Sequence, residues 1–191
     1  MRLRLRPPWR WLSPMLQFLL LRVAAGAGEP VAAAVAAVAL AGGGQRMPLL
    51  GLGTGGRVHG DAEGAYRACL EFLRLGGRHI DAALQYRNQG GVARAIREAG
   101  VRRQDVFVAS KVYLESMGFD GTVAAVRQAL GELGLEYLDL LLVHKPGRTR
   151  RLEAEDPPCV APAPAGAGPA AAPDWRGCRL GSWAALEQAK R

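Results

Sequence analysis

Three short apolar segments of this chain each end on an ionisable side chain, and the endings recur at a nearly constant spacing. The three end residues are Asp81, Lys111 and His144, which lie 30 and 33 residues apart. This spacing is about the length of one strand-plus-helix unit. Because parallel strands of a barrel all end at one face, a carboxylate, an ammonium and an imidazole are expected at the same face. The spacing therefore predicts an α/β fold of the (β/α) barrel type.

Apolar periodicity and turn residues supply the other elements of that fold. Glycines 42–44 separate two apolar arms and predict an N-terminal β-hairpin, whose second arm runs straight into the glycines that follow residue 50. Asp61 is placed to cap a helix, and Gly100 and Gly134 are placed to end two more. The predicted strands after the hairpin are 78–81, 106–110 and 137–143, and the predicted helices are 61–76, 92–99 and 122–133.

The leucine-rich segment 137–143 is typical of a parallel strand buried on both faces. With the strands and helices before it, the order β-α-β-α-β-α-β fits about the first four units of a TIM-type barrel. A complete barrel needs about 250 residues, so residues 31–146 are expected to form only a barrel half. Such a half has open strand edges, which favour self-association.

The pattern of strands and helices stops after residue 146. Residues 147–181 are rich in proline, alanine and glycine and bury too little apolar surface to offset the entropy lost on ordering, so a loop is predicted. Ser182 is predicted to cap a fourth helix that begins at 182 and continues to 191. The three cysteines lack the C-x-x-C spacing of a zinc site, and no metal site is predicted.

Positive charge is concentrated in an N-terminal leader, residues 1–30. Five arginines and no acidic residue fall in 1–28 of a chain whose net charge is +8. The order of basic residues, an apolar run at 12–21 and small residues at 25–27 is typical of a secretory signal, and an organelle transit peptide is the alternative. Without such targeting the protein is expected in the cytoplasm. The apolar run is about half of the ~20 residues that a membrane span needs, and no stable span or nucleic-acid partner is expected.

Four motifs, in order and at matching spacing, resemble one known family. They are residues 47–54, residues 77–83 followed by Tyr86 and Asn88, the dipeptide Ser110-Lys111, and residues 138–144. Together they resemble the aldo-keto reductases, a family of NADPH-dependent oxidoreductases built on a TIM barrel. A Trp-x-x-x-Glu pattern at Trp183 and Glu187 is similar to one in the same family. The resemblance covers about residues 35–146 and the last ten residues.

The resemblance implies a catalytic role for four residues in the reduction of an aldehyde or ketone to an alcohol. Tyr86 corresponds to the general acid that protonates the carbonyl oxygen as hydride arrives from NADPH. A free phenol has a pKa near ~10 and is a reluctant donor, so a neighbouring cation helps it. Lys111 corresponds to that cation, and Asp81 to the carboxylate that pairs with it. His144 corresponds to the imidazole that binds and orients the small-molecule carbonyl substrate.

The resemblance accounts for the NADPH site less completely. Gly53 and Thr54 correspond to cofactor contacts at the end of the first barrel strand, and Asp81 borders the same place. Gly55 stands where the family usually has an aromatic residue, which predicts a missing wall of the substrate pocket. The family's residues for the nicotinamide amide and the 2′-phosphate have no counterpart after the fourth strand. Two functions therefore stay open: carbonyl reduction, and a non-catalytic truncated relative that acts by binding or pairing.

A third interpretation rests on the glycines of residues 51–56, which form a G-x-G-x-x-G pattern after a predicted strand. In a Rossmann-type nucleotide binder these glycines would cradle a phosphate and Asp81 would bind the ribose. However, Asp81 lies 30 residues after the motif begins, where a spacing of about 20 is usual. This interpretation also leaves Lys111 and His144 without a role.

Overall fold

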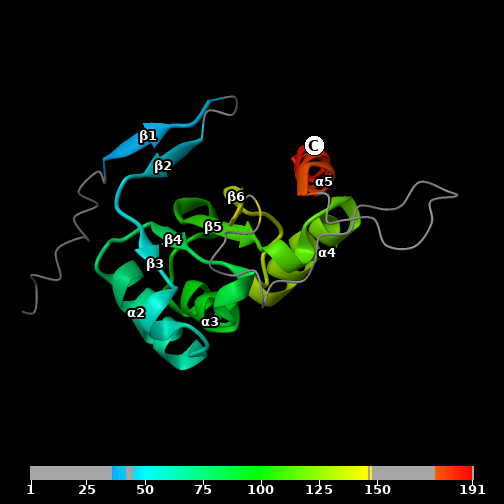
Figure 1. Ribbon diagram of the computed structural model, residues 1–191. Helices are drawn as coiled ribbons and strands as arrows, with labels where there is room; N and C mark the ends of the chain where they lie inside the picture. The colour runs from blue at the N-terminus through cyan, green and yellow to red at the C-terminus, as the bar shows by residue number, and fades with distance from the viewer. Residues whose placement is uncertain (1–35, 42–44, 146, 148–174, 191) are drawn as a thin grey trace, which may run out of the picture. The chain divides into compact units, whose positions relative to one another are not determined.

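A four-stranded parallel sheet forms the centre of the computed structural model, which describes residues 36–41, 45–145, 147 and 175–190 (Figure 1). The strand order follows the sequence, and every neighbouring pair is parallel. The strands are β3 (Leu52–Gly53), β4 (His79–Asp81), β5 (Phe107–Val112) and β6 (Leu140–Val143). The helices that follow them in turn are α2 (Ala62–Arg74), α3 (Gln89–Glu98), α4 (Phe119–Leu133) and α5 (Trp175–Ala189). This is the predicted partial (β/α) barrel of four units.

The predicted hairpin is present, and its second arm is shorter than expected. Strand β1 (Ala37–Ala39) pairs in antiparallel register with β2 (Arg46–Pro48). The arm does not run straight into the glycines, because β2 ends at Pro48 and β3 belongs to the other sheet. Nδ1 of His79 in β4 lies 2.9 Å from the carbonyl oxygen of Pro48. This hydrogen bond joins the hairpin to the parallel sheet.

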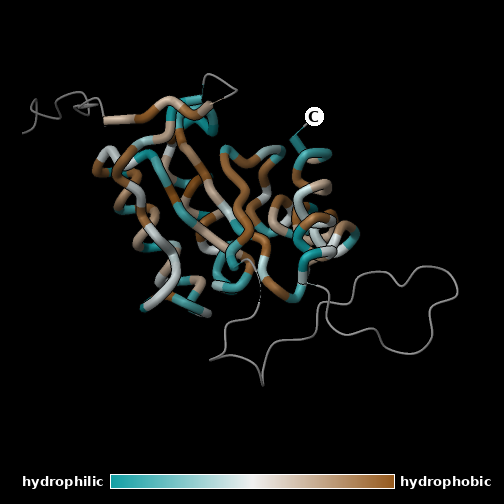
Figure 2. Tube along the Cα trace, turned by 45° about the horizontal axis from the view of Figure 1, so that its top comes forward, coloured by the Kyte–Doolittle hydropathy of each residue, from teal (hydrophilic) through white to brown (hydrophobic). Residues whose placement is uncertain are grey.

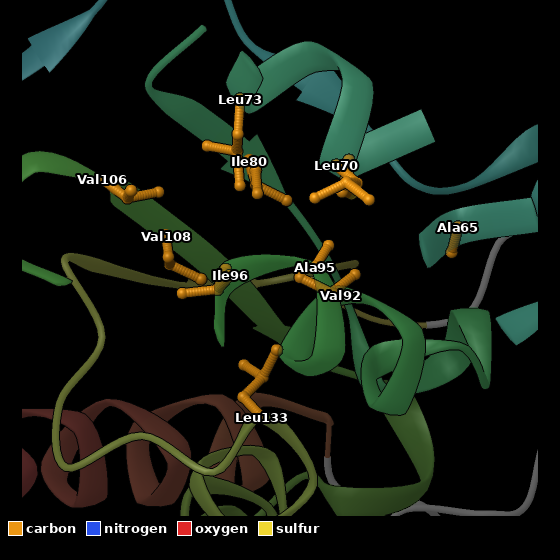
Figure 3. Packing of buried hydrophobic residues seen from close by; sticks show 11 residues of the cluster. Ala65, Leu70, Leu73, Ile80, Val92, Ala95, Ile96, Val106, Val108 and Leu133 are labelled. Atoms are coloured by element: carbon orange, nitrogen blue, oxygen red, sulfur yellow. The ribbon is translucent and has the colours of Figure 1, made fainter. Parts of the chain in front are cut away.

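The main hydrophobic core lies between one face of the sheet and helices α2 and α3 (Figure 3). Ile80 and Val108 come from neighbouring strands and are fully buried. Leu73 of α2 and Val92 of α3 pack in the same cluster, and burying each such side chain contributes about 1.5–3 kcal/mol. Figure 2 shows the apolar strands next to helices whose polar residues recur along one side. Cys69 is fully buried in this cluster, and burial raises the pKa of its thiol to about 12.

Two predicted signals determine where helices begin and end. The carboxylate of Asp61 accepts a hydrogen bond from the amide of Gly64 at 2.8 Å and caps α2. Gly134 adopts a left-handed conformation, with φ 62°, immediately after α4. Glycine reaches this conformation without steric cost. The start of α2 and the end of α4 therefore follow from capping residues that the sequence displays.

Strand β6 is shorter and more exposed than predicted. It begins at Leu140 instead of 137, and Leu142 is 40% exposed, so the expected burial on both faces is wrong. The carboxylate of Asp139 accepts hydrogen bonds from the amide of Val108 and from Arg103, each at 2.8 Å. The Asp139 carboxylate therefore replaces a strand carbonyl as the acceptor for the Val108 amide, while the Asp139 amide still donates to the Val108 carbonyl at 3.0 Å. Within the described ranges, β6 pairs only with β5 and forms the edge of the sheet.

The last helix also differs from the prediction. Helix α5 begins at Trp175, so residues 175–181 are helical and do not belong to the predicted loop. Ser182 does not cap the helix. It is fully buried within α5, where its hydroxyl accepts a hydrogen bond from the amide of Gly118 at 2.9 Å and bonds to the hydroxyl of Thr122 at 3.0 Å. Its role is to dock α5 against the start of α4.

The other parts of the predicted loop and the predicted leader cannot be compared with the structure. Residues 148–174 and 1–30 lie outside the described residues. In the part of the chain that is described, the helices are all too short or too polar to cross a membrane.

Two adjacent glycines of α3 give a matched test of the helix packing. A Cβ atom at Gly91 would overlap the carbonyl oxygen of Ala62, whereas a Cβ atom at Gly90 would have no atom within 4 Å. We expect Gly91→Ala to lower the free energy of unfolding by about 1–3 kcal/mol, because α2 must move away. Gly90→Ala should raise it by about 0.5–1 kcal/mol, because alanine is the better helix former. Urea denaturation measures both, and equal effects would contradict the close approach at Gly91.

Candidate active site

The four residues predicted to be catalytic lie together at the carboxyl end of the sheet. Asp81 is the last residue of β4, Lys111 lies near the end of β5, and His144 directly follows β6. Tyr86 ends a short 3-10 turn, η2 (Leu84–Tyr86), which follows β4. The parallel register sets this arrangement, since Asp81 pairs with Ala109 in β5. The amide of His144 continues the ladder by donating to Val112 at 2.8 Å.

The ammonium group of Lys111 connects three of these elements. It donates hydrogen bonds to Asp81 Oδ1 at 2.6 Å, to the carbonyl oxygen of Ala82 at 3.0 Å and to the hydroxyl oxygen of Tyr86 at 3.2 Å. Only 10% of the Lys111 side chain is exposed, against 37% for Asp81. Because the lysine donates to the phenol oxygen, the phenol's own proton is free to go to another acceptor. The contact also stabilises negative charge on that oxygen.

The loop after β3 holds the Tyr86 ring in place. A Cβ atom at Gly55 would lie 3.0 Å from Cζ of Tyr86, so the absence of a side chain at 55 leaves room for the ring. The amide of Gly60 donates to the carbonyl oxygen of Tyr86 at 2.8 Å. The buried side-chain amide of Asn88 donates to the carbonyl oxygens of Thr54 and Val58 at 2.7 and 2.6 Å. These bonds fix the loop against η2.

His144 lies between two aromatic rings. Its ring centroid is 5.5 Å from that of Tyr86 and 5.6 Å from that of Tyr113, both in edge-on geometry. Nδ1 of His144 is buried and has no hydrogen-bond partner in the residues that the structure describes. Burial, followed by the charges of Lys111 and Lys145, holds the pKa of His144 below its ordinary value of 6.5, although Asp81 acts in the opposite direction. The imidazole is therefore neutral at pH 7.

The residues expected to contact a cofactor differ in their accessibility. Gly53 is exposed, and a Cβ atom there would have no neighbour within 4 Å, so space is open beside the end of β3. Thr54 is buried, and its hydroxyl lies 3.4 Å from the carbonyl oxygen of Asp81. Its amide donates to the same oxygen at 3.0 Å. Thr54 therefore holds β3 against β4, while Gly53 and the Asp81 carboxylate face accessible space.

Sequence reasoning missed Tyr113, which lines a cavity next to the four-residue site. The cavity has a volume of about 850 Å³ and lies between η2, α3 and α4, and Asn88, Gln89, Tyr113 and Glu132 are among its lining residues. It shares Tyr113 with the surroundings of His144, but none of the four catalytic candidates lines it. Tyr113 is the first residue after β5 and its backbone is still extended, so it and Lys111, two residues earlier, face the same side. This spacing could have identified Tyr113.

No gathering of three or more histidine, cysteine or acidic side chains suited to a metal ion occurs among the residues that are described. The four candidate side chains bring together a phenol, an ammonium, a carboxylate and a neutral imidazole. These groups can donate a hydrogen bond and a proton to one oxygen atom.

The fold and the site define a partial (β/α) barrel with polar groups at its carboxyl end. The sequence profile of the Aldo/keto reductase family matches residues 49–191, and this chain belongs to that family. It is 45% identical over 105 residues to a 9,11-endoperoxide prostaglandin H2 reductase of Trypanosoma cruzi, a match that covers 55% of this chain and 36% of the relative. It is 39% identical over 107 residues to a glyoxal reductase of Bacillus subtilis, with coverage of 56% and 38%.

Solved structures agree with this assignment. A Bombyx mori aldo-keto reductase in complex with NADP superimposes with a TM-score of 0.62 and 28% identity, over 82% of this chain and 47% of the other. This chain spans little more than a third of the length of the Trypanosoma cruzi and Bacillus subtilis relatives. The Rossmann-type interpretation of residues 51–56 is wrong, because the fold is that of a barrel and Asp81 is paired with Lys111.

The position of His144 makes its protonation measurable. We expect its imidazole signals in NMR to titrate below pH 6.5, and Asp81→Asn should lower the midpoint further, because a negative charge that favours the imidazolium is lost. Unfolded His144 takes up a proton near pH 6.5 and the folded imidazole does so only at lower pH. Its contribution to stability is therefore complete above pH 6.5 and is lost as the pH falls from 6.5 through the lower pKa of the folded imidazole.

The effect of His144 protonation on stability is measured as the pH dependence of the unfolding free energy. His144→Gln should flatten this dependence below pH 6.5, whereas His59→Gln serves as a matched control outside the four-residue site. A His144 midpoint above 6.5 would contradict the burial of the ring between the two tyrosines.

Proposed function

We propose that this chain carries the proton-donating site of an NADPH-dependent reductase that converts aldehydes or ketones to alcohols. The observation that carries the proposal is the single ammonium of Lys111, which donates both to Asp81 and to the phenol oxygen of Tyr86. The neutral imidazole of His144 lies against the same phenol ring. A carbonyl oxygen is the substrate group that these donors suit.

The reaction assigns one task to each side chain. The Tyr86 hydroxyl and an N–H of His144 donate hydrogen bonds to the carbonyl oxygen and orient it. The nicotinamide of NADPH, when bound, supplies hydride to the carbonyl carbon. As the carbon–oxygen double bond becomes single, the oxygen takes the proton of Tyr86, and the phenolate that remains is stabilised by Lys111. Asp81 pairs with the lysine and holds it in place, and solvent returns the proton to Tyr86.

The residues present fit the reacting end of the cofactor. Open space beside Gly53 adjoins the accessible carboxylate of Asp81, which itself contacts Lys111. Gly53 and Asp81, which are partners in the register of β3 and β4, are the residues that would hold the nicotinamide end of the cofactor. The relatives support this type of substrate and cofactor, since one is a glyoxal reductase and another was solved with NADP.

The alternative of a non-catalytic relative that acts by pairing has support of its own. Strand β6 has its second edge unpaired within the described residues, and apolar Leu142 is 40% exposed on it. Exposed strand edges readily accept another strand. Self-association of the chain is therefore part of the proposal, with or without catalysis.

Removal of one hydroxyl tests the catalytic proposal. We expect Tyr86→Phe to lower kcat for reduction of a simple aldehyde by about 10²–10⁴-fold, because the general acid is lost. NADPH binding, followed by its fluorescence, should be retained. Tyr137→Phe removes the same atom from an exposed ring next to Arg103 and should keep the parent rate. Equal rates for Tyr86→Phe and the parent would contradict the assignment, and absence of both NADPH binding and turnover would favour the non-catalytic alternative.

Size-exclusion chromatography with light scattering tests the pairing. We expect the average mass to rise with protein concentration and Leu142→Lys to reduce this rise, because a charge on an exposed strand opposes pairing. Leu180→Lys makes the same change at an exposed position of α5 and should have a smaller effect. A monomer at every concentration would contradict association through the β6 edge.

A further inference from the structure

We infer that Lys145 selects carbonyl substrates that carry a second, negatively charged group such as a carboxylate. The inference rests on the proposed reductase function and deepens it by naming a substrate class. It concerns a lysine that the catalytic arrangement does not use. Lys145 follows His144 directly, beyond the end of β6.

The surroundings of Lys145 differ from those of Lys111. Lys111 is paired with the carboxylate of Asp81 at 2.6 Å. Lys145 is only half-buried, and its ammonium forms a long hydrogen bond of 3.4 Å to the hydroxyl of Tyr113 and lies 5.3 Å from the centre of that ring. In the described ranges no carboxylate lies within salt-bridge distance of it. The cation therefore has an aromatic neighbour and no neutralising partner there.

A continuous row of rings connects Lys145 to the reacting groups. Tyr86 packs edge-on against His144, and His144 packs edge-on against Tyr113, with centroid separations of 5.5 and 5.6 Å. The Lys145 ammonium is bonded to the hydroxyl of Tyr113. The Tyr113 ring is thus a shared neighbour of the His144 imidazole and of the Lys145 ammonium. A substrate with its anion about one benzene ring away from its carbonyl group would reach both.

The charge balance at this place favours an anion. Two ammonium groups act on the His144 imidazole, and one carboxylate, Asp81, opposes them. Asp81 is already bonded to Lys111. The positive charge of Lys145 is therefore the one that no carboxylate of this group balances. Partial burial strengthens its attraction for an opposite charge relative to bulk water. The Tyr113 hydroxyl can add a hydrogen bond to the same anion.

A pair of matched aldehydes tests the inference with the full chain. The probes are 4-carboxybenzaldehyde and its neutral methyl ester, and the quantity measured is the ratio of their kcat/KM values. We expect Lys145→Met to lower this ratio about 10-fold, equivalent to ~1.4 kcal/mol, mainly through a higher KM for the charged aldehyde. Added salt should lower the ratio in the parent protein and not in the variant. Lys145→Arg should keep most of the preference.

Controls separate this inference from the reductase proposal. Lys190→Met removes one positive charge just after α5 and should keep the parent ratio. An equal loss with both aldehydes in Lys145→Met would indicate a structural role only and would overturn the inference. If neither aldehyde is reduced, the proposed function fails. The anion site at Lys145 is then tested separately by calorimetric binding of 4-(hydroxymethyl)benzoate. Weaker binding to Lys145→Met than to the parent supports the anion site, and equal binding overturns it.

Discussion

The ion pair between Lys111 and Asp81 is the interaction on which the arrangement of the site depends. A lysine whose side chain is 10% exposed needs an opposite charge, since removal of a cation from water costs several kcal/mol. Asp81 supplies that charge from the neighbouring strand, and the remaining donors of the lysine bind Ala82 and Tyr86. One buried charge thus fixes the ends of two strands and the turn that carries the phenol.

The hydrophobic core places this polar cluster without taking part in it. Ile80 and Val108 pack under α2 and α3, and the alternation of side chains along each strand turns Asp81 and Lys111 to the opposite face. The burial of apolar surface therefore determines the register, and the register brings the two charges together. Such a division of roles lets the core tolerate changes that leave the site intact, provided that the parallel register is kept.

Sequence reasoning recovered the parts of this molecule that local signals encode. The spacing from Asp81 to Lys111 to His144 predicted their convergence, and the family resemblance supplied Tyr86, which no periodicity identifies. The start of β6 was missed because the Asp139 side chain bonds to the Val108 amide, a contact between positions far apart in the sequence. Ser182 was misplaced because a serine that caps a helix and a serine buried between two helices look alike in the sequence.

The two lysines near His144 illustrate why residue type alone does not define a role. Lys111 is neutralised by Asp81 and bonds to the phenol oxygen of Tyr86, so in the proposed reduction its charge would act where negative charge develops. Lys145 has the same ammonium group but rests against Tyr113, with no such partner among the residues described here. Both charges disfavour the imidazolium form of His144, so the ring can donate a hydrogen bond without adding a third positive charge. With the imidazole neutral, the Tyr86 phenol is the proposed proton donor, and Lys145 is the cation proposed to bind a charged ligand.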